Sequence, residues 1–191
     1  MSTTKLTDIA QVGSASSIIK DLEIKPLISH GDDRGFFREI IRGTDPFFPQ
    51  GSFAQWSHSK MQKDVVKAWH YHHVQYDWWY IPIGRAQIGL YDYREESPTY
   101  GSLLLFELGE SSKFGERTFE ACVKIPQGVL HGCRVLSEQA HLFYITSEIY
   151  NPEDEGRLRY DTDLVPHDWG SNAIVAENDK RDFIPINKRI K

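Results

Sequence analysis

The chain has few cysteines, no long apolar run and no excess of basic residues. Its 191 residues include only 2 cysteines, Cys122 and Cys133, which are too few for a disulfide framework. No apolar stretch approaches the ~18 residues of a membrane-spanning helix, and the N-terminal residues lack the apolar core of a secretion signal. We therefore expect a cytoplasmic protein with reduced thiols and no membrane partner.

The charge balance is slightly acidic. The chain has 22 Lys and Arg against 27 Asp and Glu, which gives a formal net charge of -5 at pH 7. Nucleic-acid-binding domains usually carry a basic face, so this balance argues against a nucleic-acid partner. A local basic pocket for one anionic ligand is compatible with it. Hydrophobic residues make up 40% of the chain, which is typical of a globular domain.

Short apolar runs separated by turn residues follow one another from residue 18 onward. They are rich in Ile, Val, Phe, Tyr and Trp and recur about every ten residues, a pattern typical of an all-β sandwich or barrel. Helical periodicity is poor, so we expect short helical turns only. We predict a flexible N-terminal tail over 1–17, one β domain over 18–170 and a C-terminal extension over 171–191.

Two histidine-containing segments point to chemistry. The first contains His70, His72 and Asp77, and the two histidines should share one strand face because alternate residues point the same way. The second segment reads Pro-x-Gly-x-x-His and ends at His131. Together they resemble the two signature motifs of the cupin superfamily, with Asp in place of the usual Glu. The resemblance implies a cupin-type jelly roll, that is, a double-stranded β-helix barrel.

Further motifs occur in a fixed order over about residues 22–169. They are Asp32-Asp33-Arg34-Gly35-Phe36-Phe37-Arg38-Glu39, Phe53-Ala54-Gln55, His70, Asp92-Tyr93-Arg94, Ser97-Pro98-Thr99-Tyr100-Gly101, Ile125-Pro126-Gln127-Gly128, and Tyr150-Asn151-Pro152-Glu153-Asp154-Glu155. In this order they resemble the dTDP-4-dehydrorhamnose 3,5-epimerase family. These are cupins that epimerise nucleotide-linked 4-keto-6-deoxy sugars, so the resemblance implies an epimerase acting on such a sugar.

The resemblance also assigns catalytic roles. His70 is the expected general base, which removes a proton from the carbon next to the ketone, and Tyr144 is the expected general acid on the opposite face. The enolate formed between these steps needs cationic or hydrogen-bonding groups near its oxygen. Lys67 stands where the family has Arg, and Asp161 is the expected acid that orients His70.

A set of nucleotide-binding residues follows from the same resemblance. The expected substrate-binding residues are Arg34, Phe37, Glu39, Gln55, Arg94 and His131. Arginine suits a diphosphate because its planar fork forms paired hydrogen bonds, and Phe37 is placed to stack on the base. Family members are typically homodimers that exchange an N-terminal strand. We therefore expect a homodimer in which Arg34 and Phe37 help to complete the site of the neighbouring copy.

The chain departs from the family pattern around the catalytic histidine. Asp77 stands where the family has a Lys, and His72 stands where Gln is frequent. With His70 and His131 they make a set of three histidines and one carboxylate, suited to divalent Zn, Fe, Mn or Ni. One alternative is therefore a metal-dependent cupin enzyme, an isomerase or a dioxygenase. Another is a nucleotide-sugar binding module without turnover. The leading interpretation, the epimerase, requires no cofactor.

Overall fold

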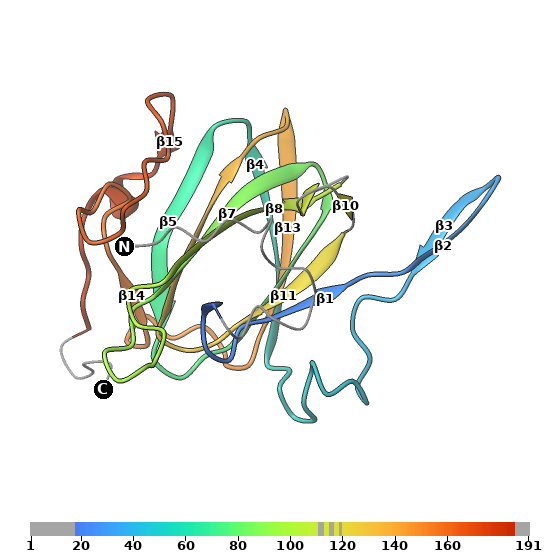
Figure 1. Cartoon of the computed structure of the whole chain (residues 1–191), viewed down its shortest axis with the longest axis horizontal. Coiled ribbons are helices and arrows are strands. Elements are labelled where there is room, and N and C mark those ends of the chain that lie inside the picture. Colours follow the sequence, from blue (N-terminus) through green and yellow to red (C-terminus); the bar gives the residue numbers. More distant parts are fainter. Residues whose placement is uncertain (1–17, 111–112, 115–116, 119, 186–191) are drawn as a thin grey trace.

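Two β-sheets face each other in the computed structural model, which describes residues 18–110, 113–114, 117–118 and 120–185 (Figure 1). One sheet contains, in spatial order, β1 (Glu23–Pro26), β11 (Ala121–Ile125), β6 (Asp77–Ile83), β13 (Gln139–Thr146) and β4 (Gln55–Gln62). The other contains β14 (Glu155–Arg157), β5 (Val65–His72), β12 (Val129–Val135), β7 (Arg85–Asp92) and β8 (Leu103–Gly109). The short strand β15 (Ile174–Val175) pairs with β5.

The path of the chain between the sheets is that of a jelly roll. From β4 to β7, and again from β11 to β14, each strand lies in the sheet opposite its predecessor. Among the described strands of the two sheets, all pairs are antiparallel except β15 with β5, which is parallel. In the part of the chain that the structure describes, helical structure is confined to short turns such as the 3-10 turn η2 (Glu177–Lys180). The predicted all-β, cupin-type fold with short helical turns is confirmed.

Two hydrophobic layers hold the six-stranded sheet. Its inner face packs against the other sheet in the main core, which includes Ile88, Leu104 and Val135. Its outer face is covered by a second cluster that includes Trp69 and Trp169. This double burial explains why β7 is buried at almost every position, where a strand covered on one face would alternate.

Glycine makes the outer layer possible. A Cβ atom on Gly89 would lie 2.6 Å from Cη2 of Trp69, and one on Gly132 would lie 3.0 Å from Cζ2 of Trp169. The bare backbone of β7 and β12 therefore accommodates the two indole rings. Cys122 and Cys133 are free and buried, as small apolar residues would be.

The segment predicted as a C-terminal extension packs on the barrel as far as the structure describes it. Val175 lies beside Val66 through β15, and Phe183 pairs with Arg157 through an isolated bridge. Between them, η2 carries the buried side chain of Asp179. The predicted tail over 1–17 lies outside the described residues. Among the described residues, no helix is long and apolar enough to cross a membrane; the cytoplasmic location stays a prediction.

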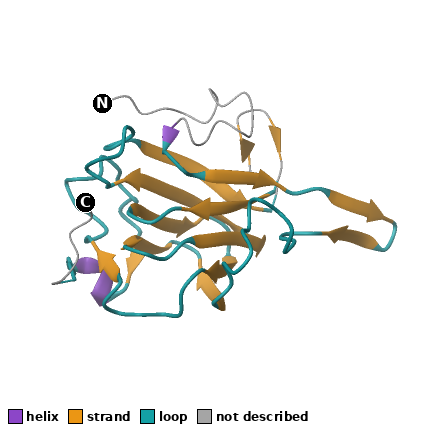
Figure 2. Ribbon diagram, turned by 90° about the horizontal axis from the view of Figure 1, so that it is seen from below, coloured by secondary structure: helices purple, strands orange, loops and turns teal. Residues whose placement is uncertain are grey.

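An arm projects from the barrel near the N-terminus. It is the antiparallel hairpin of β2 (Ser29–Asp32) and β3 (Gly35–Arg38), which extends well beyond the rest of the molecule (Figures 1 and 2). Phe36 and Phe37 on β3 are 63% and 69% exposed. A second short hairpin joins β9 (Lys113–Phe114) to β10 (Arg117–Thr118).

Candidate active site

A cavity of about 220 Å³ lies between the two sheets. Strands of both sheets line the cavity. Alternate side chains of a strand point to opposite faces of its sheet, and those on the inner faces reach the cavity. Seven residues predicted from the sequence as site residues line it: Gln55, Lys67, His70, His72, Asp77, His131 and Tyr144. The structure therefore brings residues from five strands and distant parts of the chain to one place.

Strand pairing explains why the histidines meet. His131 on β12 lies directly opposite His70 on β5, and their ring centroids are 6.5 Å apart. His72, two residues further along β5, stacks on His131 with a centroid distance of 5.4 Å. The predicted common orientation of His70 and His72 is consistent with their joint place in the cavity lining. Tyr144 reaches the cavity from β13 of the facing sheet.

His70 is held between two carboxylates. Its Nε2 lies 2.9 Å from Oδ1 of Asp179, and its Nδ1 lies 3.2 Å from Oε1 of Glu155. Burial alone lowers the pKa of His70, but the two carboxylates outweigh burial and raise the pKa to about 9. Glu155 lines the cavity and Asp179 does not, so the Nδ1 side of the ring is the side toward the cavity.

The acid that orients His70 is Asp179 in this structure. Asp161, the acid expected from the sequence, is exposed and forms an ion pair with Arg159, whose Nε is 3.2 Å from Oδ1. It lies in a separate surface hollow with Trp169 and not in the cavity. Asp179 stands 18 residues further along the chain, on η2, and its side chain is only 5% exposed.

The hydrogen bonds of His131 and Asp77 fix both side chains. Nδ1 of His131 lies 3.0 Å from the Val129 carbonyl oxygen, so it donates there and Nε2 keeps its lone pair. Burial lowers the pKa of His131 to about 4; the Asp77 carboxylate opposes this shift, and His72 reinforces it. Asp77 accepts hydrogen bonds from Gln75 Nε2 at 2.7 Å and from Trp79 Nε1 at 3.0 Å.

Three of the four residues predicted as alternative metal ligands lie together. One ligand atom each from His72, Asp77 and His131 are all within 4.8 Å of one another. His70 is not part of this group, and both of its nitrogens face carboxylates. Two imidazoles and one carboxylate fit a divalent transition-metal ion. Lys67, also in the cavity, donates from Nζ to Ser59 Oγ at 2.8 Å.

The residues expected to bind the nucleotide on the arm do not reach the cavity of their own chain. Arg34 forms an ion pair with Asp32 at the exposed end of the arm. Glu39 forms one with Arg42 at 2.8 Å. Phe37 is mostly exposed. Within one copy, these side chains and the cavity are separate.

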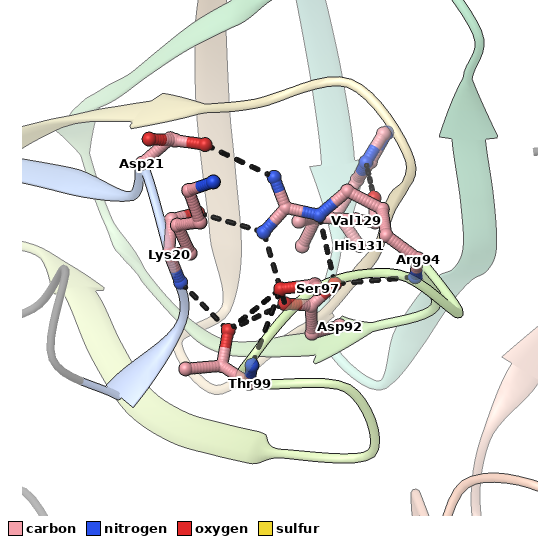
Figure 3. Close-up of polar contacts among 8 residues, drawn as sticks. All are labelled: Lys20, Asp21, Asp92, Arg94, Ser97, Thr99, Val129 and His131. Atoms are coloured by element: carbon pink, nitrogen blue, oxygen red, sulfur yellow. Dashed lines mark hydrogen bonds and ion pairs between the residues drawn. The ribbon is translucent and has the colours of Figure 1, made fainter. Parts of the chain in front are cut away.

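Arg94 also lies away from the cavity lining. Its guanidinium donates two hydrogen bonds to the fully buried carboxylate of Asp92, at 2.8 and 2.9 Å, and one to the Lys20 carbonyl oxygen at 2.7 Å (Figure 3). Ser97 and Thr99 donate to the same carboxylate at 2.6 Å each. The geometry makes Arg94 the counterion of Asp92 within the fold.

Sequence reasoning gave no role to two residues that shape the site. Glu155 stands in a family motif, yet only the antiparallel pairing of β14 with β5 reveals that it meets His70. Gln75, which supports Asp77, lies before β6 in a stretch without clear periodicity. A buried carboxylate in the sequence requires donors nearby, and that requirement was the available signal for Gln75.

The jelly roll and its enclosed histidine–carboxylate pair define a cupin-type protein with a candidate proton-transfer site. The family model described as dTDP-4-dehydrorhamnose 3,5-epimerase matches residues 17–184. The chain belongs to this family, and it is a carbohydrate epimerase.

Relatives and solved structures agree with this assignment. The chain is 38% identical over 157 residues to the spore coat polysaccharide biosynthesis protein SpsL of Bacillus subtilis, covering 81% of this chain and 98% of the relative. It is 33% identical over 160 residues to the probable low-salt glycan biosynthesis epimerase Agl13 of Haloferax volcanii, covering 80% and 96%. The crystal structure of dTDP-6-deoxy-D-glucose-3,5-epimerase RmlC from Legionella pneumophila, in complex with dTDP-4-keto-L-rhamnose, superposes with a TM-score of 0.69, 29% identity and coverage of 84% and 86%.

Proposed function

We propose that this epimerase acts on a dTDP-4-keto-6-deoxyhexose-like nucleotide sugar and inverts one or both carbons next to the ketone. The observation that carries the proposal is His70, held between Asp179 and Glu155 on one sheet while Tyr144 enters the same cavity from the facing sheet. The Legionella relative solved with dTDP-4-keto-L-rhamnose supports this ligand class.

The proposed reaction is a proton transfer on each face of the sugar. A carbonyl group acidifies the neighbouring C–H bond. The pKa of about 9 keeps His70 mostly protonated at pH 7, so the minor, neutral form of the ring takes that proton and the electron pair moves onto the carbonyl oxygen. The two carboxylates make the neutral ring a strong proton acceptor, because they stabilise the imidazolium that forms. Tyr144 then gives its hydroxyl proton to the opposite face of the carbon. Lys67 supplies positive charge near the enolate.

The nucleotide end of the ligand requires the arm of a second copy in this proposal. Arg34 and Phe37 stand on the projecting hairpin, away from the cavity of their own chain. In a homodimer, Arg34 would bind the diphosphate of the ligand in the neighbouring cavity and Phe37 would stack on its base. Gln55 and His131 line the cavity itself and would contact the sugar.

Deuterium exchange tests the proposal directly. The protein is incubated in D₂O with a dTDP-4-keto-6-deoxyhexose, and mass spectrometry follows deuterium entering the sugar. We expect uptake with the wild type, and a loss of about 10²–10⁴-fold in the rate with His70→Gln. His58→Gln is the matched control, because this exposed histidine pairs with His141 on the surface. Uptake by His70→Gln at the wild-type rate would refute the role of His70. Tight dTDP binding with no uptake in the wild type would indicate the binding module instead.

A further inference from the structure

We propose that His72, Asp77 and His131 form a binding site for one divalent transition-metal ion in the cavity, distinct from the proton-transfer residue His70. The proposal goes beyond the epimerase reaction and does not depend on it. It stands on the burial of Asp77, on the distances among the three side chains and on the hydrogen bonds that orient them.

The burial of Asp77 is the first argument. Its side chain is buried, with 4% of its surface exposed. No lysine or arginine of the described chain forms a salt bridge with it; its hydrogen-bond donors are the neutral groups of Gln75 and Trp79. Ionised carboxylates are rarely buried unless a cation or a metal ion compensates them. A positive charge bound beside Asp77 would meet this need.

The distances are the second argument. The ligand atoms of the three residues lie within 4.8 Å of one another. Metal–ligand bonds of about 2.0–2.2 Å place neighbouring ligands of a tetrahedral ion about 3.4 Å apart. The three atoms therefore need to approach by up to about 1.4 Å, and the half-buried His72 side chain has room to rotate toward the other two. His131 and Asp77 are buried and supply the fixed side of the site.

Orientation of the ligands is the third argument. His131 donates from Nδ1 to the Val129 carbonyl oxygen, so Nε2 presents its lone pair. Histidines that bind metals typically donate their other ring nitrogen to a carbonyl or carboxylate in this way, and ligating carboxylates are themselves hydrogen-bonded. Asp77 meets the second condition through Gln75 and Trp79. Both side chains are thus arranged as metal ligands before any ion binds.

The neighbouring histidine separates this site from proton transfer. His70 would be the nearest fourth ligand, but Asp179 and Glu155 hold its two nitrogens. Three protein ligands leave further positions of the ion open to the cavity, as in catalytic metal sites. Two imidazoles and one carboxylate suit Zn, Fe, Co, Ni or Mn in the divalent state. When bound, such an ion supplies a Lewis-acidic charge beside a ligand oxygen.

Metal binding without substrate is the test. The full chain is stripped with EDTA, titrated with Zn²⁺ or Co²⁺, and its metal content is measured after gel filtration; visible absorption of the Co²⁺ form reports the ligand field. We expect one equivalent per chain for the wild type and for the control His30→Gln, whose histidine is exposed on the arm. We expect at least about tenfold weaker binding for His72→Gln and Asp77→Asn.

A measurement on the wild type keeps the proposal testable should a variant fail to fold. X-ray absorption of the Zn²⁺-loaded protein should show only nitrogen and oxygen ligands, two of them imidazoles. A sulfur ligand would place the ion elsewhere and overturn the proposal. Substoichiometric binding of both metals, or unchanged affinity in both folded variants, would overturn it as well. Because no sugar is present, any of these failures leaves the proposed epimerisation standing, and a failure of deuterium uptake leaves the metal site standing.

Discussion

Oδ1 of Asp179 lies 2.9 Å from Nε2 of His70, although 109 residues separate them in the chain. The contact depends on β15, which runs beside β5, and on η2, which follows β15 directly. Asp179 supports the ring from the side away from the cavity, while Glu155 meets it from the cavity side. The histidine proposed as the base is therefore positioned by two segments that follow the last long strand.

Removing the Asp179 carboxylate should slow epimerisation and leave the barrel intact. Asp179→Asn keeps the size of the side chain but loses the charge that stabilises the imidazolium, so we expect kcat to fall by about 10²–10⁴-fold. The control is Asp161→Asn, whose side chain faces Arg159 at the surface. We expect this control to stay within about twofold of the wild type. Equal losses in the two variants would contradict the role of Asp179.

Removing the Tyr144 hydroxyl should separate the two proton transfers. Tyr144→Phe retains the ring that packs against the main core, so we expect little change in stability. His70 can still take the proton, but return on the opposite face should slow by about 10²–10⁴-fold. The measurement compares deuterium entry at the original configuration with formation of the inverted sugar. A variant that inverts the centre at the wild-type rate would exclude Tyr144 as the acid.

Mixing two inactive variants tests whether the arm serves a neighbouring copy. His70→Gln lacks the base but has an intact arm, and Phe37→Ala has the base but lacks the exposed ring on the arm. In a closed dimer with exchanged arms, random mixing pairs an intact His70 with an intact arm in about one quarter of the sites. We therefore expect activity to recover to about that fraction after joint refolding. No recovery, with dimers present by light scattering, would show that each arm serves its own copy.

Arg94 should act on stability and not on ligand binding. Arg94→Ala leaves the carboxylate of Asp92 fully buried without its counterion, and such a loss typically destabilises a protein by about 3–5 kcal/mol. Urea unfolding measures the change, and titration with dTDP under folding conditions measures the affinity. A large loss of dTDP affinity with unchanged unfolding free energy would return Arg94 to the binding residues expected from the sequence.

The same pair gives a pH dependence. Burial raises the pKa of Asp92, but hydrogen bonds from Arg94, Ser97 and Thr99 outweigh burial and hold the pKa below its ordinary value. The stabilisation is therefore fully present above the unfolded pKa of about 3.9 and is lost as the pH falls through the lower folded value. We expect the difference in unfolding free energy between wild type and Asp92→Asn to shrink below about pH 4. A difference that stays constant down to pH 2 would contradict this.

Local patterns predicted the fold and much of the cavity lining. Strand alternation and two short motifs predicted that His70, His72, Asp77 and His131 lie together. Side chains of a strand can point only to the inside or the outside of the barrel, so the pattern fixes which ones face inward. The contact of Asp179 with His70 could not be predicted from the sequence, because a short turn in a polar segment has no periodicity that shows where it packs. Spacing also gives no sign that Asp92, two residues before Arg94, accepts hydrogen bonds from its guanidinium.

The packing of the segment after residue 170 on the barrel determines when, during synthesis, the proposed active site is completed. Most strands of both sheets leave the ribosome earlier, so a nearly complete barrel can exist while the imidazole of the proposed base still lacks its rear support. A chain cut short after residue 170 would retain every long strand and the Trp169 side chain, and would lose the Asp179 carboxylate that supports His70. The proposed activity therefore requires that the segment carrying Asp179 has been synthesised and has packed on the barrel.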